Sequence, residues 1–129
     1  SAPATLERVK RLEQAGVISY FTAVIDPEKI GFSIMAVVNI SLSLSNLSSV
    51  AAIKEKFIEL DEVIQCYQIA GANDFVLKVV AKDIKAYGKF MNMKLTQIEG
   101  IQVIKSSFVI DNVKEKKMFV LDLDEEYGV

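Results

Sequence analysis

The chain has 129 residues, of which 51% are hydrophobic and 25% charged, and its formal net charge is −2. This length suffices for one domain with a modest core, and the small net charge does not mark a polyanion-binding protein. The sequence contains no histidine, which removes the commonest general base and the commonest metal ligand. We therefore predict no catalytic site, no metal site and no cofactor.

The composition also indicates in which compartment of the cell the protein is expected. The longest uninterrupted apolar run is Ile34–Val38, whereas a membrane-spanning helix needs about 20 such residues, so we expect no membrane partner. The single cysteine, Cys66, has no partner for an internal disulfide, which favours an intracellular, cytoplasmic location. Because Cys66 lies in the middle of a predicted strand with apolar residues on both sides of it, we interpret it as a small buried side chain rather than a reactive thiol.

The first predicted element is a helix near the start of the chain, and Gly16 is well placed to end it. Its apolar stripe consists of Leu6, Val9 and Leu12. Its other faces carry three cations, Arg8, Lys10 and Arg11. Two interpretations stay open for these cations: a solvated surface, or contacts with DNA phosphates.

Three further elements are predicted before residue 61. The β-branched and aromatic stretch "VISYFTAVI" (17–25) predicts a strand, and "DPEKIG" (26–31) a turn. Apolar residues then alternate with others from residue 32 to residue 45, which is the period of a strand with one covered face. A helix is indicated by the spacing of Val50, Ile53, Phe57 and Leu60.

The second half of the chain repeats these patterns. Residues 62–70 and 75–82 predict two strands joined by the short loop "GAND" (71–74). Asp83 can cap a helix whose apolar stripe is Ile84, Tyr87, Met91, Leu95 and Ile98. Residues 101–111 predict a fourth strand of this region, and "KMFVLDL" (117–123) a fifth.

From residue 32 onward, the predicted order is strand, helix, strand, strand, helix, strand. This order is that of an α+β, ferredoxin-like βαββαβ sandwich, in which both helices cover one face of an antiparallel sheet. The other face has no intrachain cover, so we predict a dimer formed sheet to sheet. The side chains available for that contact are Met35, Val37, Val76 and Val80.

The "GANDF" stretch admits two interpretations. In one it is a plain hairpin turn, with Gly71 at positive φ and Asp74 bonded to its own backbone. In the other it is the edge of a small-ligand site, where turn N–H groups meet a carboxylate and Asp74 binds an ammonium group.

Two stretches of the chain resemble the leucine-responsive and asparagine-type (Lrp/AsnC) transcriptional regulators. They are "LERVKRLEQAGVISYFTAVIDPEKIGF" (6–32) and "IAGANDFVLKVVAKDIKAYGKFMNMKLTQIEGI" (69–101). Together they extend the resemblance over nearly the whole chain, to about Lys117. The resemblance implies that residues 1–26 are the recognition helix and hinge strand of an incomplete helix-turn-helix domain. Residues 27–129 would then be a RAM domain, which binds effectors and oligomerises.

The resemblance also implies roles for individual residues. The DNA-binding residues would be Ser1, Thr5, Arg8, Lys10 and Arg11. An amino-acid effector would bind between dimers, and the effector-binding residues would be Gly71, Asn73, Asp74 and Ser106. The homodimers would assemble further, often into octamers, and the intact protein would bind double-stranded DNA.

This chain departs from the family pattern in four places. The two helices that precede the recognition helix are not in the sequence, and Ala70 stands where a threonine or serine is frequent. Asn73 replaces a frequent aromatic residue, and Ile104 and Ser106 stand where two threonines are usual. The alternative function is a stand-alone RAM-like sensor or accessory subunit without DNA binding. An enzyme on the same fold, such as the related haem-precursor decarboxylases, would rely on histidines that the sequence lacks.

Overall fold

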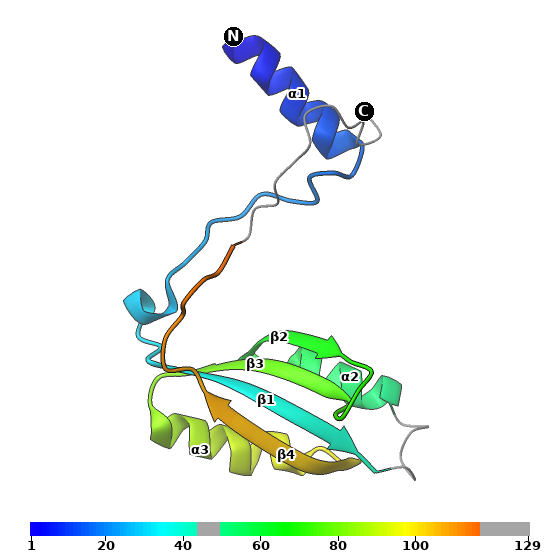
Figure 1. Ribbon diagram of the computed structural model, residues 1–129, viewed down its shortest axis with the longest axis vertical. Helices are drawn as coiled ribbons and strands as arrows, with labels where there is room; N and C mark the ends of the chain where they lie inside the picture. The colour runs from blue at the N-terminus through cyan, green and yellow to red at the C-terminus, as the bar shows by residue number, and fades with distance from the viewer. Residues whose placement is uncertain (44–49, 117–129) are drawn as a thin grey trace. The chain divides into compact units, whose positions relative to one another are not determined.

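The computed structural model describes residues 1–43 and 50–116 (Figure 1). The chain forms two compact units, of which one contains Ser1–Ile25 and the other is Asp26–Asn112. The predicted fifth strand, 117–123, lies outside the described residues.

The second unit contains one antiparallel sheet and two helices. The sheet has four strands in the order β2-β3-β1-β4. Along the chain the elements are β1 (Ile34–Leu42), α2 (Val50–Glu59), β2 (Val63–Gln68), β3 (Phe75–Ala81), α3 (Ile84–Met93) and β4 (Ile101–Phe108). This is the predicted ferredoxin-like βαββαβ arrangement, which is thereby confirmed.

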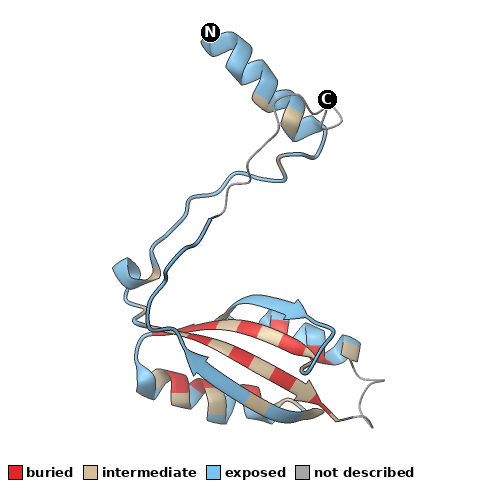
Figure 2. Cartoon of the chain, viewed as in Figure 1, coloured by how far each residue is buried: buried red, intermediate tan, exposed pale blue. Residues whose placement is uncertain are grey.

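The alternation in the sequence corresponds to the two faces of the sheet. In β1, Ala36, Val38, Ile40 and Leu42 are buried, while the residues between them are half-buried. Figure 2 shows the same alternation in the first part of β3, whose last three residues, Val79, Val80 and Ala81, are all buried. The buried side chains of both strands pack with Ile53 and Phe57 of α2 and with Tyr87 and Phe90 of α3. The core therefore lies between the sheet and the two helices.

The helix α3 differs in part from its predicted stripe. Asp83 caps it as predicted, because its carboxylate accepts the Ala86 N–H at 2.7 Å. Phe90, which the prediction omitted, is buried, whereas Ile84 in the first turn is 60% exposed. The helix ends at Met93, and a 3-10 turn (Leu95–Gln97) carries the fully buried Leu95. A single helical period therefore could not describe all of residues 84–98.

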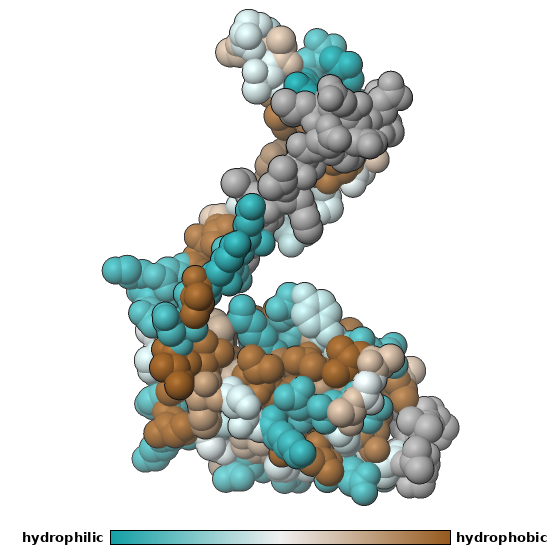
Figure 3. Space-filling view, viewed as in Figure 1, coloured by the Kyte–Doolittle hydropathy of each residue, from teal (hydrophilic) through white to brown (hydrophobic). Residues whose placement is uncertain are grey.

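The described residues place no helix on the opposite face of the sheet (Figure 1). Met35, Val37 and Val76 are half-buried there. Val80, predicted to share this face, is only 5% exposed and has little surface left for a partner. Figure 3 shows apolar side chains gathered among polar ones over the strands.

The first unit begins with α1 (Ala2–Gln14), which contains no buried residue. Gly16, with a φ of 78°, follows the helix as predicted. The strand predicted over residues 17–25 is wrong for the chain by itself, because these residues form no ladder. A strand needs a neighbour for its backbone groups, and Tyr20, Phe21 and Val24 each keep at least 67% of their surface exposed.

The predicted turn joins this segment to β1. Pro27–Ile30 form a 3-10 turn in which the Asp26 carboxylate accepts the Glu28 N–H at 3.1 Å. Gly31 follows with a φ of 94°, a conformation that favours glycine. Within residues 1–43 and 50–116, no helix is long and apolar enough to cross a membrane.

Candidate functional site

The turn between β2 and β3 is fixed to the end of β1. Its ends are joined by the Ile69 N–H, which donates to the Asp74 carbonyl at 2.9 Å. The Asp74 N–H donates to the Ile40 carbonyl at 2.8 Å, and the Asp74 carboxylate accepts the Leu42 N–H at 2.7 Å. The Ser41 hydroxyl donates to Asn73 Oδ1 at 3.1 Å. Asn73 and Asp74 are therefore held in place by the central strand.

This geometry corrects two details of the plain-turn interpretation. Gly71 does not have a positive φ, and a Cβ built on it would meet no atom within 4 Å. The side chain of Asp74 bonds the backbone of β1 rather than its own. The turn thus owes its shape to contacts with β1 and not to a left-handed glycine.

The turn also has groups suited to a polar ligand. Asn73 and Asp74 are half-buried, and Gly71 and Ala72 are exposed. A carboxylate offers about four acceptor positions, so the bond from Leu42 leaves Asp74 able to accept hydrogen bonds from an ammonium group. Gly71, Asn73 and Asp74 lie together in this turn, and their role in binding an effector stays a prediction.

Ser106 lies elsewhere in the sheet. It is opposite Val38, whereas the β4 residue opposite Ser41, beside the turn, is Val103. The Tyr87 hydroxyl donates a hydrogen bond to the Ser106 hydroxyl, and the Tyr87 and Phe108 rings pack edge to face with centroids 5.0 Å apart. Within one chain, Ser106 therefore belongs to the contact between β4 and α3.

The five predicted DNA-binding residues all lie on or beside α1. The Ser1 hydroxyl accepts the Ala4 N–H at 3.4 Å and caps the helix, and the Thr5 hydroxyl donates to the Ser1 carbonyl at 3.0 Å. Arg8, Lys10 and Arg11 are exposed. The structure thus places these cations where an anionic partner can reach them, and their role in DNA binding stays a prediction.

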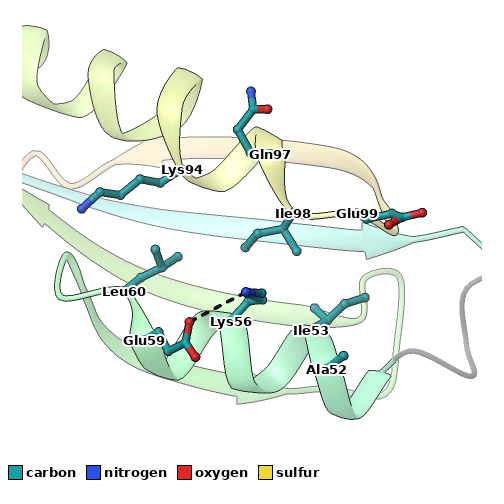
Figure 4. Close-up of a pocket in the computed structure, with 9 residues that line it drawn as sticks. All are labelled: Ala52, Ile53, Lys56, Glu59, Leu60, Lys94, Gln97, Ile98 and Glu99. Atoms are coloured by element: carbon teal, nitrogen blue, oxygen red, sulfur yellow. Dashed lines mark ion pairs between the residues drawn. The ribbon is translucent and has the colours of Figure 1, made fainter.

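A groove beside α2 was not expected from the sequence. It opens between α2 and the 3-10 turn that follows α3, with a volume of about 760 Å³ (Figure 4). Ile53, Leu60 and Ile98 form its apolar part, and at its rim Lys56 lies 4.0 Å from Glu59. Lys94 is bound to Glu62 at 2.7 Å. The sequence signals the apolar residues only as core positions, so it cannot indicate a groove.

Cys66 differs from its predicted environment because it is exposed. It lies on β2, at the edge of the sheet, where fewer neighbours can cover it. Desolvation by the surrounding protein still raises the pKa of its thiol, and the nearby Lys54 opposes this with a smaller effect. The thiol therefore stays protonated at neutral pH, which disfavours the reactive thiolate.

No metal centre is formed by the part of the chain that the structure describes, since no three His, Cys, Asp or Glu side chains gather there.

Comparisons with known proteins bear on this site. Residues 35–119 match the profile of the Lrp/AsnC ligand binding domain. The transcriptional regulator AzlB of Bacillus subtilis is 34% identical over 125 residues, which cover 97% of this chain and 78% of that protein. The Bkd operon transcriptional regulator of Pseudomonas aeruginosa is 35% identical over 109 residues, covering 84% of this chain and 71% of that protein.

Two solved structures of relatives contain an amino acid. A transcriptional regulator of Neisseria meningitidis in complex with L-methionine has a TM-score of 0.87 at 25% identity, covering 95% of this chain and 79% of the other. A feast or famine regulatory protein of Mycobacterium tuberculosis, complexed with L-methionine, has a TM-score of 0.75 at 26% identity, covering 94% and 80%. The relatives are named as regulators of transcription and not as enzymes. With its fold and the match over residues 35–119, the chain belongs to the Lrp/AsnC family of transcriptional regulators.

Proposed function

We propose that this chain is the effector-sensing and oligomerising part of a DNA-binding transcriptional regulator, and that its effector is an amino acid bound at the turn Gly71–Asp74. The observation that carries the proposal is the fixed position of Asn73 and Asp74 against β1, through the bonds from Ser41 and Leu42. A site whose side chains are already held loses little conformational entropy when it binds a ligand. The L-methionine complexes of two relatives support an amino acid as the ligand.

Each group of the turn has a role in this proposal. Asp74 accepts hydrogen bonds from the α-ammonium group, and the backbone N–H groups near Gly71 donate to the α-carboxylate. Asn73 adds a side-chain amide beside them. Ser106 is three residues along β4 from Val103, the residue that lies beside the turn. Its hydroxyl therefore joins the site only when a neighbouring chain brings its own β4 to this turn.

A variant that lacks the negative charge of Asp74 tests the proposal. A thermal-shift screen of the twenty amino acids identifies the ligand, and calorimetry then compares the wild type with Asp74→Asn. The amide oxygen of asparagine still accepts the Leu42 N–H, so the fold is kept while the charge is lost. A charge-assisted hydrogen bond contributes about 1.5–3 kcal/mol, so we expect Asp74→Asn to weaken binding at least tenfold, for which about 1.4 kcal/mol suffices.

Asp83→Asn is the matched control, because it removes the same charge at a helix cap where asparagine is equally suitable. Its affinity for the amino acid should equal that of the wild type. The proposal is wrong if no amino acid stabilises the protein at millimolar concentration, or if Asp74→Asn binds as tightly as the wild type.

A further inference from the structure

The side-chain amide of Asn73 is held in one orientation by Ser41. The Ser41 hydroxyl donates a hydrogen bond to Asn73 Oδ1 at 3.1 Å. An amide carries its acceptor on the oxygen and its two donors on the nitrogen, so the donors lie on the side of the amide away from Ser41. No other hydrogen bond joins the Asn73 side chain to residues 1–43 or 50–116. Both donors of Asn73 Nδ2 are therefore available to a ligand.

The nitrogen of this amide also keeps contact with solvent. Among the described residues, no fully buried side-chain nitrogen or oxygen lacks a hydrogen-bond partner, so the unpartnered Nδ2 is not fully buried. The Asp74 carboxylate lies in the same turn and accepts the Leu42 N–H with Oδ2, which leaves Oδ1 able to accept from a ligand. A donor and an acceptor, both held by β1, thus belong to neighbouring residues of the turn.

Ser41 lies on the face of the sheet that the helices do not cover. Its neighbours in β1, Ile40 and Leu42, are buried in the core, and successive side chains of a strand point to opposite faces. Val103 of β4 is directly opposite Ser41, so its side chain lies on the same face, where it is 39% exposed. The surface beside the Asn73 amide thus combines a polar donor with an apolar side chain.

The role of this amide rests on the proposed function, in which the turn Gly71–Asp74 binds an amino acid. Asp74 then binds the α-ammonium group, and backbone N–H groups near Gly71 bind the α-carboxylate. The side chain of the effector is the remaining substituent of its α-carbon, and Asn73 is the remaining polar side chain of the turn. Val103 offers a surface for the aliphatic part of that side chain, whereas Asn73 Nδ2 needs an oxygen to accept its hydrogen bond.

We propose that Asn73 determines which amino acid the site binds, and that Ser41 is the positioning residue that orients its amide. Asn73 Nδ2 donates to an oxygen at the end of the effector's side chain. The effector is then an amino acid whose side chain ends in a carboxamide or a carboxylate. This class differs from the ligand of two relatives, which are complexed with L-methionine, because the methionine side chain has no oxygen.

An apolar side chain is disfavoured in this position for a physical reason. It would displace water from Asn73 Nδ2 without replacing the hydrogen bond, and a donor left unpaired costs its desolvation free energy. A site that hydrogen-bonds a polar group of its ligand therefore rejects analogues that lack this group. Ser41 supports the selection because it keeps Nδ2 toward the ligand, and a side chain that is already held loses little conformational entropy on binding.

The first experiment compares amino acids of similar shape on the unaltered chain. Leucine is compared with asparagine and aspartate, and methionine is compared with glutamine and glutamate. Calorimetry gives the Kd of each amino acid. Because the α-groups are the same within a set, the ratio of two Kd values reports the side chain alone. In at least one set, we expect an oxygen-bearing amino acid to bind at least about tenfold tighter than the apolar one. This ratio needs no variant, so it tests the proposal even if a variant does not fold.

The second experiment changes the amide and the residue that orients it. Asn73→Leu replaces the amide with an apolar group of similar shape, so the ratio should fall to about one or below. Ser41→Ala leaves the Asn73 amide free to rotate, so the ratio should fall about three- to tenfold, which is the cost of fixing one side chain on binding. Ser41→Thr keeps the hydroxyl and should keep the ratio. Ser107→Ala is the matched control, because Ser107 lies on the same face of the sheet, opposite Val37.

Two outcomes would overturn this inference. One is an apolar amino acid that binds as tightly as its oxygen-bearing counterparts in both sets. The other is a folded Asn73→Leu or Ser41→Ala variant that keeps the wild-type ratio. Either result leaves the proposed function intact when binding still depends on the charge of Asp74, whereas the proposed function itself fails if no amino acid binds. A preference for side-chain oxygen that Asn73→Leu abolishes and Ser41→Thr retains would establish the inference.

Discussion

Phe57 is the side chain that fixes α2 onto the sheet. It is 1% exposed, and its ring packs edge to face on Phe75 with the centroids 5.2 Å apart. A phenylalanine at this place contributes both buried area and a specific ring contact. Phe57, together with the buried Ile53, therefore fixes the position of α2 on the sheet.

We predict that Phe57→Ala lowers the free energy of unfolding by about 3–5 kcal/mol, because it leaves a cavity in a close-packed core. Urea denaturation followed by circular dichroism measures this change. The adjacent Ile58→Ala is the control, since Ile58 is 81% exposed and surface changes are usually within about 0.5 kcal/mol. If the two variants lost the same free energy of unfolding, the packing of Phe57 in the core would be contradicted.

Cys66 is predicted to react slowly for an exposed thiol. Burial raises its pKa, and the thiolate is the nucleophile. Alkylation by iodoacetamide at neutral pH should be slower in the folded chain than in urea. The midpoint of the pH–rate profile should lie at a higher pH in the folded chain than in urea. Lys54→Gln should raise the midpoint further, because Lys54 lowers the pKa. The pKa of the Cys66 thiol is higher in the folded chain than in the unfolded chain. The contribution of this thiol to the free energy of unfolding is therefore fully present below the unfolded pKa, and it is lost as pH rises through the folded pKa.

If the pH–rate profile of alkylation has the same midpoint in the folded chain and in urea, the folded protein does not perturb the pKa of this thiol. A lower midpoint in Lys54→Gln would show that the charge of Lys54 does not act on it.

The strand β1 shows how far a sequence can specify an element. Its alternation predicted which residues are buried, because period two and one covered face leave a single solution. For β3 the sequence predicted a strand, but the open-face position predicted for Val80 is wrong, since Val80 is buried. The ferredoxin-like order followed from these strands and the two helices between them.

For the segment 17–25, the local sequence does not suffice to predict the structure. Its residue types favour a strand, yet a strand also needs a neighbour, and local sequence does not contain one. The turn Gly71–Asp74 gives a similar lesson, because its shape depends on Ser41 and Leu42, about thirty residues earlier in the chain. The sequence predicted which residues form the turn but not the contacts that hold them.

The helix α1 should be the least protected helix in hydrogen exchange. It buries no residue, and a helix of 13 residues is marginal in water without tertiary packing. Mass spectrometry of peptides after brief labelling should show fast exchange over residues 2–14, with β1 and β3 exchanging most slowly. Protection of α1 equal to that of β1 would show that α1 packs on a surface of its own.

The face of the sheet that the two helices do not cover predicts association of whole molecules. Val37 lies near its centre, directly opposite Lys78 on β3. In a face-to-face dimer, Val37→Lys adds an unpaired cation beside Lys78, and burying such a charge is costly. We predict at least a tenfold weaker dimer by sedimentation equilibrium, a change that corresponds to about 1.4 kcal/mol.

Ala51→Lys is the control, because it places the same cation on an exposed position of α2. It should associate as the wild type does. A wild-type chain that is monomeric at micromolar concentration, or a Val37→Lys variant that associates normally, would refute the face-to-face dimer.

The exposed cations of α1 bear on how this chain binds DNA. Arg8, Lys10 and Arg11 give each copy of α1 three exposed cations, and Ser1 and Thr5 lie at the end that a recognition helix directs to the bases. Such a helix reads bases only when other elements hold it in the groove, whereas here Leu6, in its apolar stripe, is 57% exposed. We therefore expect this chain to bind duplex DNA weakly, without sequence preference and with strong salt dependence, as phosphate contacts require.

Fluorescence anisotropy with the DNA upstream of the chain's own gene and a scrambled duplex tests this. The two duplexes should bind alike, and affinity should fall steeply as salt rises. The triple variant Arg8→Gln, Lys10→Gln and Arg11→Gln should reduce the slope of log affinity against log salt by about 0.9 for each phosphate contact it removes. Tight binding that prefers the upstream duplex at physiological salt would show that α1 is already held in a reading position, so the exposure of its apolar stripe would not limit recognition.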